Sequence, residues 1–232
     1  MFIGHYALGF GSKRLAPGIS LGALFLACQW ADLLWPILVM AGVESFTIRP
    51  GITVVTPLDF QHDPSSHSLL ALLVWGALLA LIYRAVSGSS LRGAIVLGAL
   101  VVSHWVLDVI VHRPDLPLAP GNGLRLGFGL WNSIPATLAV EFGLYVVGVW
   151  LYWKATVARD RLGSLGFWAL VTFLAVVQIA NVFGPPPPGV GAVTVSALAM
   201  WLLVAWGYWV DRHRKPAFVA KVALDLTRLP GA

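Results

Sequence analysis

The stretch SLRGAIVLGALVVSHWVLDVIVH, residues 90–112, holds only two fully charged side chains, those of Arg92 and Asp108. A helix of this length can cross the hydrocarbon core of a bilayer, which takes about 20 mostly apolar residues. Because lipid offers no hydrogen-bond partner to a free backbone, a helix is the expected spanning element. The stretch therefore predicts a transmembrane helix that carries His104 and Asp108 in its second half.

Apolar runs of similar length recur along the chain. Hydrophobic residues make up 58% of the 232 residues and charged residues 11%, against about 25% charged residues in soluble globular proteins. This composition excludes an ordinary soluble enzyme and a disordered chain, because so few charged side chains cannot cover a soluble surface. We predict an all-α polytopic membrane protein with about six transmembrane helices, at about residues 18–42, 66–86, 90–112, 131–154, 163–183 and 191–211.

Two further segments complete the predicted organisation. The apolar piece at residues 2–12 is too short to cross a bilayer, so we expect a short N-terminal re-entrant or interfacial helix. Residues 1–211 would then form a single transmembrane helical domain, followed by a cytoplasmic tail at residues 212–232. The mixture of apolar and basic residues in this tail suits either an amphipathic helix on the anionic inner leaflet or a frayed end.

The lysine and arginine residues gather in four places, which fall on one side of the membrane if the chain has six spans. By the positive-inside rule this side is the cytoplasm, and both termini face it. The basic residues concerned are Lys13, Arg14, Arg84, Arg92, Lys154, Arg159, Arg161, Arg212, Arg214 and Lys215. The formal net charge of +5 thus reflects membrane topology and predicts no nucleic-acid partner. The single cysteine, Cys28, excludes an intramolecular disulfide and a zinc site with several cysteines.

Ionisable side chains within the predicted spans all lie at a similar depth, towards the non-cytoplasmic ends. They are Asp32, His67, His104, Asp108 and Glu141, and the polar Gln178 and Asn181 share this depth. A charged group inside a bilayer costs at least about 2.5 kcal/mol on insertion scales, so each is a functional candidate by default. We expect these residues to converge on one buried polar site.

The segment Ser103-His104-Trp105-Val106-Leu107-Asp108 is the sharpest local motif. A four-residue step places His104 and Asp108 on one helical face, one turn apart, where a nitrogen and a carboxylate oxygen can bind one divalent ion. His112 continues this face by another turn. A hydrogen bond that merely joins helices is the alternative. In the first span, Pro36 predicts a kink beyond Asp32 that would open space at the same depth.

The segment from His62 to Ser68 forms a second motif at the start of a predicted span. A helix N-terminus attracts anions, so a phosphate or carboxylate could bind beside Ser65, Ser66 and Ser68. The alternative is a serine N-cap next to solvated loop histidines.

Together these motifs resemble the YdjM-like family of bacterial inner-membrane metal-dependent hydrolases. The resemblance covers residues 1–112 and rests on His5, Asp32, the His62-x4-His67-Ser68 element and the Ser103-His104-x-x-x-Asp108 element. It implies a divalent metal ion, zinc first, and a hydrolytic reaction, with distant kinship to zinc-dependent phospholipase C. The ligands it implies are His5, Asp32, His67, His104 and Asp108, with His62 as a further candidate. Leu34 and Asp63 stand where the family often has a second carboxylate and a basic residue.

The resulting hypothesis is a membrane-embedded metal-dependent hydrolase that acts on a lipid or lipid-linked (phospho)ester at the outer leaflet. Glu141 is the candidate general base, because a carboxylate buried at that depth has a raised pKa, and His62 is a second catalytic candidate. The candidate substrate contacts are Ser68, Ser103, His112 and Arg113. Histidine and carboxylate ligands also suit manganese and magnesium.

Two other functions fit the same residues. The His/Asp cluster could form part of a proton or metal-ion transporter, although polar groups are scarce in the cytoplasmic halves of the predicted spans. The cluster could also serve only to join helices in a non-catalytic membrane scaffold.

Overall fold

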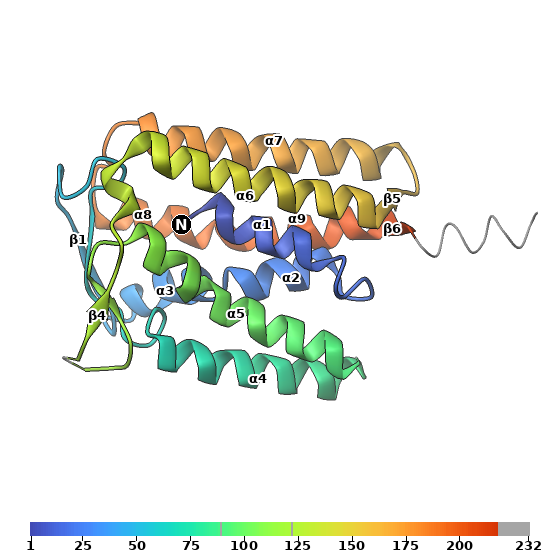
Figure 1. Cartoon of the computed structure of the whole chain (residues 1–232), viewed down its shortest axis with the longest axis horizontal. Coiled ribbons are helices and arrows are strands. Elements are labelled where there is room, and N and C mark those ends of the chain that lie inside the picture. Colours follow the sequence, from blue (N-terminus) through green and yellow to red (C-terminus); the bar gives the residue numbers. More distant parts are fainter. Residues whose placement is uncertain (89, 122, 218–232) are drawn as a thin grey trace, which may run out of the picture.

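The computed structural model describes residues 1–88, 90–121 and 123–217, which form a bundle of roughly parallel and antiparallel helices (Figure 1). The helices are α1 (Ile3–Ser12), α2 (Leu21–Cys28), α3 (Trp30–Met40), α4 (Leu69–Ser87), α5 (Leu91–Val111), α6 (Ile134–Ala155), α7 (Arg161–Phe183), α8 (Val190–Leu198) and α9 (Met200–Arg212). A single turn of 3-10 helix at Leu130–Asn132 precedes α6. The predicted amphipathic segment of the tail, residues 218–232, lies outside the described residues.

Three small antiparallel sheets lie at the two ends of the bundle. At one end, β1 (Ser45–Ile48) pairs with β2 (Leu58–His62), and β3 (Leu116–Pro117) pairs with β4 (Arg125–Leu126). At the other end, β5 (Thr156–Ala158) pairs with β6 (Arg214–Pro216). The start of the predicted tail is therefore a strand that is fixed to the α6–α7 connection.

Five helices are long and apolar enough to cross a membrane. They are α4, α5, α6, α7 and the continuous pair α8–α9, which is interrupted only at Ala199. The pair α2–α3 adds a sixth crossing if the bent pair counts as one span. The prediction of a mostly helical chain with apolar spanning helices is thus confirmed, whereas the number of six spans stays a prediction.

Side-chain caps at the starts of the helices explain where they begin. Ser68 accepts a hydrogen bond from the backbone N–H of Ala71, three residues into the helix, and Asp160 caps α7 in the same way. Such a cap satisfies one of the N–H groups that a helix start leaves without a partner. The other capping serines are Ser20, Ser90 and Ser133. Helix α4 ends at Gly88, whose positive φ of 60° suits a glycine.

The first predicted span breaks at Gln29, before Asp32, and the kink predicted beyond Asp32 stays a prediction. Helices α2 and α3 meet there at an angle of 59°, whereas Pro36 lies inside α3. Pro36 has no backbone N–H group, so one hydrogen bond within α3 is missing. The chain turns seven residues earlier, at Gln29. The turn leaves the carbonyl group of Cys28 free to accept a hydrogen bond from another helix.

Helix α1 lies inside the bundle, and its predicted re-entrant or interfacial position in the membrane stays a prediction. Ile3, Tyr6 and Phe10 are fully buried, and the helix packs on α6, α2 and α5. The approach to α6 is close because a Cβ atom at Gly148 would lie 2.2 Å from the carbonyl oxygen of Ala7. Only glycine fits there, so α1 is held deep within the protein.

The connections α1–α2, α4–α5 and α6–α7 and the end of α9 all lie at one end of the bundle (Figure 1). The four groups of basic residues predicted to share a side fall in these connections, and we call this end the basic end. These groups thus share one end of the bundle. The side of the membrane that this end faces stays a prediction.

A second polar cluster, fully paired, lies at the basic end. The ammonium group of Lys13, 3% exposed, lies 2.5 Å from an Asp211 carboxylate oxygen, and the hydroxyl group of Tyr152 donates to the other oxygen at 2.9 Å. The Arg214 guanidinium donates to the hydroxyl and carbonyl oxygens of Thr156 and to the Gly163 carbonyl oxygen. These bonds join the ends of α1, α6, α7 and α9.

We predict that Lys13→Met destabilises the protein by about 3–5 kcal/mol, because it leaves the Asp211 carboxylate buried without its counter-charge. Unfolding in detergent, followed by tryptophan fluorescence, measures the loss. The exposed Lys154→Met is the matched control and should change little. Equal stability of the two variants would contradict a role for the Lys13–Asp211 pair.

Candidate metal centre

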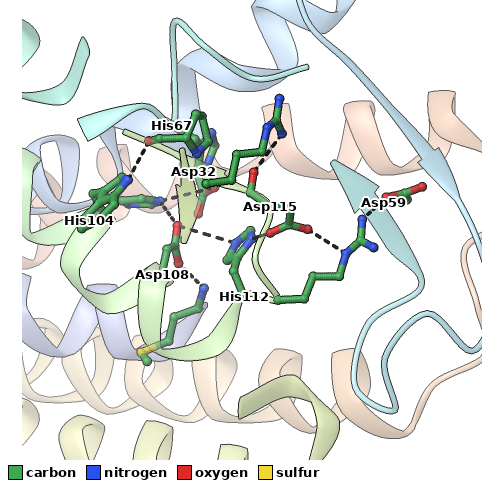
Figure 2. Close-up of polar contacts among 12 residues, drawn as sticks. Asp32, Asp59, His67, His104, Asp108, His112 and Asp115 are labelled. Atoms are coloured by element: carbon green, nitrogen blue, oxygen red, sulfur yellow. Dashed lines mark hydrogen bonds and ion pairs between the residues drawn. The ribbon is translucent and has the colours of Figure 1, made fainter. Parts of the chain in front are cut away.

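A cluster of histidine and aspartate side chains lies part-way along the bundle, towards the end opposite the basic end (Figure 2). Its members come from four segments: His5 from α1, Asp32 from α3, His67 from just before α4, and His104 and Asp108 from α5. Asp32 is partly exposed and the other four are buried. The structure therefore brings together four residues that the sequence placed at one depth, Asp32, His67, His104 and Asp108, and adds His5 to them.

The ligand-type atoms of the cluster face one another at short range. The Nε2 atoms of His5 and His104 lie 3.0 Å and 3.1 Å from the two oxygens of Asp108. The His67 Nε2 atom lies 3.3 Å from Asp32 Oδ1, and the His104 Nε2 atom lies 3.7 Å from the same oxygen. The rings of His5 and His104 stack at 3.7 Å with an angle of 4° between their planes, so both Nε2 atoms approach Asp108 from one side.

Hydrogen bonds on the far side of two histidine rings fix which nitrogen faces the cluster. The Nδ1–H of His104 donates to the carbonyl oxygen of Cys28 at 2.9 Å. The Ser66 hydroxyl group donates to Glu44 at 2.6 Å, so its oxygen accepts from the Nδ1–H of His67 at 2.7 Å. In both rings the lone pair is therefore on Nε2, as in metal-binding histidines that are oriented by an outer partner.

These residues fit a divalent metal ion. Two overlapping groups of three, His5–His104–Asp108 and Asp32–His67–His104, each have donor atoms within 4.8 Å of one another. The His104 Nε2 atom is buried and makes no well-directed hydrogen bond within the described residues, although Asp108 is near. Two carboxylates and neutral imidazole nitrogens are a ligand set that zinc, manganese and other divalent ions accept.

Two further charged groups lie beside the cluster. The amino group of Met1 lies 2.5 Å from Asp108 Oδ1. Glu141 on α6 accepts hydrogen bonds from the backbone N–H groups of Phe2 and Gly4 at 2.8 Å and 3.2 Å. Both bonds use Oε2, and no described residue donates to Oε1. Glu141 therefore positions the start of α1 and keeps one oxygen available.

A chain of ion pairs leads outward from His112. The Nδ1 atom of His112 lies 3.0 Å from Asp115 Oδ1, and its Nε2 atom lies 4.0 Å from Asp108 Oδ2. Arg113 binds the other oxygen of Asp115 at 2.8 Å and also binds Asp59 of β2 (Figure 2). Asp59 and Asp115 are functional candidates that the sequence reasoning missed. The spacing of Asp115 three residues after His112 was the available signal.

The cluster forms one wall of a cavity of about 800 Å³. Asp32, His67, Asp108, His112 and Glu141 line it on the polar side. The rest of the lining is mostly apolar and comes from α7, α8 and α9, from the segment 55–58 and from three prolines of the α7–α8 connection. The predicted site is thus accessible from a large cavity, and Gln178 and Asn181 line that cavity too.

His5 and His104 belong to the cluster but do not line this cavity, and four other predicted site residues do not line it either. His62 is exposed on β2, and the Arg113 guanidinium is engaged by Asp59 and Asp115. The Ser68 hydroxyl group caps α4 and donates to the Pro64 carbonyl oxygen. The Ser103 hydroxyl group donates to the Leu100 carbonyl oxygen of its own helix. These contacts give the four residues structural roles in the described part of the chain.

Comparison with known protein families, curated proteins and solved structures finds no match for this chain. The class of site therefore rests on the geometry of the cluster, and the YdjM-like resemblance of the motifs stays a prediction.

Asp63 lies beside the cluster and is 1% exposed, yet neither of its carboxylate oxygens has a hydrogen-bond partner among the described residues. Burial raises the pKa of this carboxyl, and the charges that act on it belong to His67, His112, Glu44 and Arg125. When the pKa of a carboxyl is higher in the folded protein than in the unfolded chain, folding favours the protonated form. The contribution of this group to the free energy of unfolding is therefore fully present below the unfolded pKa and is lost as the pH rises through the folded pKa.

We predict that Asp63→Asn raises the thermal midpoint at pH 7.5, by about 2–4 °C for each kcal/mol regained, and changes it little at pH 4. The control is Asp160→Asn. The His213 hydrogen bond holds the pKa of the Asp160 carboxyl below its usual value. Its loss should therefore destabilise at pH 7.5, with the difference disappearing as the pH falls. A lower midpoint for Asp63→Asn at pH 7.5 would contradict the first prediction.

Proposed function

We propose that this protein is a membrane-embedded metal-dependent hydrolase of a lipid or lipid-linked (phospho)ester, acting at the outer leaflet of a bacterial inner membrane. The observation that supports this most is the position of the cluster. Five side chains with metal-binding atoms meet in one cluster, and three of them, Asp32, His67 and Asp108, line a large cavity beside helices that are apolar enough to cross a membrane. The proposed ligands are His5, Asp32, His67, His104 and Asp108.

The distances favour a single ion. Metal–ligand bonds of about 2.0–2.2 Å place neighbouring ligand atoms about 3–3.5 Å apart around one ion. The measured separations run from 3.0 to 3.7 Å. In addition, the Nδ1 atom of His104 is taken by the Cys28 carbonyl, so this ring has one nitrogen to offer and cannot bridge two ions.

A bound divalent ion supplies a Lewis acid and lowers the pKa of water towards about 7. The Oε1 atom of Glu141 is the available base beside the cluster and would take the proton from the attacking water. The Nε2 atom of His112 faces the same cavity, with the ring held by Asp115, and would contact the substrate. The water oxygen would form the new bond as the ester bond breaks, and the leaving oxygen would receive a proton.

The setting favours a substrate that comes from the membrane. The cavity has apolar walls on α7, α8 and α9, which belong to two of the helices apolar enough to span a bilayer. A lipid already in the bilayer reaches such a cavity sideways without crossing water.

A proton or metal-ion transporter is the second candidate, and the broken span favours it. Broken helices often form ion sites in transporters, and Gln29, at the break, is fully buried with neither side-chain atom hydrogen bonded within the described residues. However, an aromatic layer that includes Tyr6, Phe10 and Phe25 lies between the cluster and the basic end. Ion uptake into liposomes without hydrolysis would favour the transporter.

We predict about one divalent ion per chain in the purified protein. His104→Ala and Asp108→Asn each remove a proposed ligand and should hold less than about 0.1 ion per chain, because even a change to a residue that only orients a ligand lowers the metal affinity about 10–100-fold. Elemental mass spectrometry after zinc loading measures this content. The matched control is His62→Ala, which removes an exposed histidine outside the cluster and should keep the ion. A metal-free wild type that resists zinc loading would overturn the hydrolase proposal.

We predict that Glu141→Gln lowers lipid-ester hydrolysis at least about 100-fold, the usual contribution of a general base, and leaves the metal content unchanged. Glutamine retains a carbonyl oxygen for Phe2 and Gly4, so the start of α1 stays in place. Turnover of lipid phosphoesters and carboxylic esters in mixed micelles, with zinc, manganese or magnesium, is the measurement. Wild-type protein that holds its ion but cleaves none of these lipids would count against this function.

A further inference from the structure

Helices α7 and α9 contact each other near the basic end and diverge towards the cluster. Near the basic end the approach is tight, since a Cβ atom at Gly166 would lie 2.2 Å from the Trp209 ring. One step further, the rings of Phe173 and Trp206 lie 5.7 Å apart. Beyond this pair, α8 packs on α3 while α7 packs on α9 and α1, and residues of α7 and of α8–α9 face each other across the cavity. We call this part of the cavity the α7–α9 groove.

The α7–α9 groove is long enough for a lipid chain in one leaflet. Its residues on α8–α9 run from Ala192 to Trp206, which spans about 21 Å at 1.5 Å per residue. One leaflet contributes half of a hydrocarbon core of about 30 Å, or about 15 Å. The groove is closed at its inner end by the Phe173–Trp206 pair and reaches the cluster at its outer end.

The groove is open on the side that faces lipid. Phe173 on α7 is 46% exposed and Leu202 on α9 is 70% exposed, and both side chains also line the cavity. A side chain that lines a cavity and is also exposed on a spanning helix marks an edge where the two surfaces join. A hydrocarbon chain can therefore enter between α7 and α9 from the bilayer.

One polar side chain interrupts the apolar wall. Gln178 on α7 is 2% exposed and lines the cavity, yet no described residue donates to or accepts from its amide group. Asn181, three residues on, lines the cavity as well. The amide group faces the cavity, where it can hydrogen-bond to a polar group of a ligand.

The groove carries no lysine or arginine among its described lining residues. A polar group next to Gln178 is therefore uncharged, as an ester carbonyl or a hydroxyl group is, because a second phosphate there would meet no cation. Any negative charge on the ligand belongs beside the metal-binding cluster.

We propose that the α7–α9 groove binds one acyl chain of a membrane glycerolipid and that Gln178 hydrogen-bonds to its acyl ester. The headgroup end would then lie over the His/Asp cluster. This inference deepens the proposed function and rests on it for the chemistry at the headgroup, whereas the position of the chain can be tested without any reaction.

The test uses the full chain reconstituted in phosphatidylcholine vesicles that contain a phosphatidylcholine with a photoreactive diazirine on its acyl chain. Peptide mass spectrometry after illumination maps the labelled residues. We expect labelling between residues 173–182 and 193–206 to exceed labelling of α4, which faces lipid but has no groove. Equal labelling of α4 and of these segments would overturn the proposal.

Ala197→Trp would fill the groove. Loss of contact with only two methylene groups corresponds to about tenfold weaker binding, so groove labelling should fall at least about tenfold. The matched control is Ala77→Trp on the exposed face of α4, which should leave groove labelling unchanged. If Ala197→Trp fails to fold, Ser196→Trp at the exposed edge of the groove replaces it. Undiminished labelling in a folded groove variant would refute the proposal.

Gln178→Leu separates the polar contact from the chain contact. We expect this variant to retain labelling by the photoreactive acyl chain. In competition with the photoreactive lipid, however, an unlabelled diacyl lipid should no longer reduce the labelling more than its ether-linked analogue does. No such preference in the wild type would exclude the Gln178 contact.

The two proposals fail separately. Groove labelling combined with no lipid-ester hydrolysis by the metal-loaded protein would leave the groove in place and remove the hydrolase. Hydrolysis that Ala197→Trp does not slow, in a protein without groove labelling, would keep the hydrolase and remove the groove.

Discussion

The hydrogen bond from His104 to the carbonyl group of Cys28 is the contact on which the candidate site depends. A helix break inside a bundle leaves backbone groups that water cannot reach, so the break at Gln29 needs a partner from another helix. His104 supplies that partner and thereby fixes its own ring, with Nε2 facing Asp108. The break also turns the first residues of α3, and hence Asp32, towards the same point. One bond thus joins the backbone of the bent span to the geometry of the cluster.

The bundle contains two polar clusters that differ in one physical respect. At the basic end, Lys13 neutralises Asp211, and the donors of Arg214 are directed to oxygens of the protein. At the other end, two aspartates meet imidazole rings whose lone pairs point inward, so the cluster has an excess of acceptors. Saturated pairing is what a structural cluster requires, because an unpaired buried charge is costly. An excess of acceptors around one point is what a cation-binding cluster requires.

Much of this arrangement could be predicted from the sequence, because the membrane restricts the possible structures. Hydropathy located α5 at 91–111 within a residue of the prediction at each end, and the four-residue step correctly placed His104 and Asp108 on one face. The break at Gln29 could not be predicted, because it depends on the His104 bond 76 residues away. The contacts of Asp59 and Asp115 were missed for the same reason, since Arg113 joins them across two loops. Tertiary contacts of this kind leave no local periodicity.

The burial of α1 has a consequence for the order of assembly. This helix has almost no lipid-facing surface, and its backbone N–H group at Gly4 bonds to Glu141, 137 residues later in the chain. At about 5–20 residues per second, synthesis separates these two groups by about 7–27 s. During that interval the surface of α6 on which α1 packs is not yet present. The surface of α1 is also not suited to lipid on all sides. Its insertion must therefore be a late step of folding, and the metal-binding cluster, which includes His5, is completed only with that step.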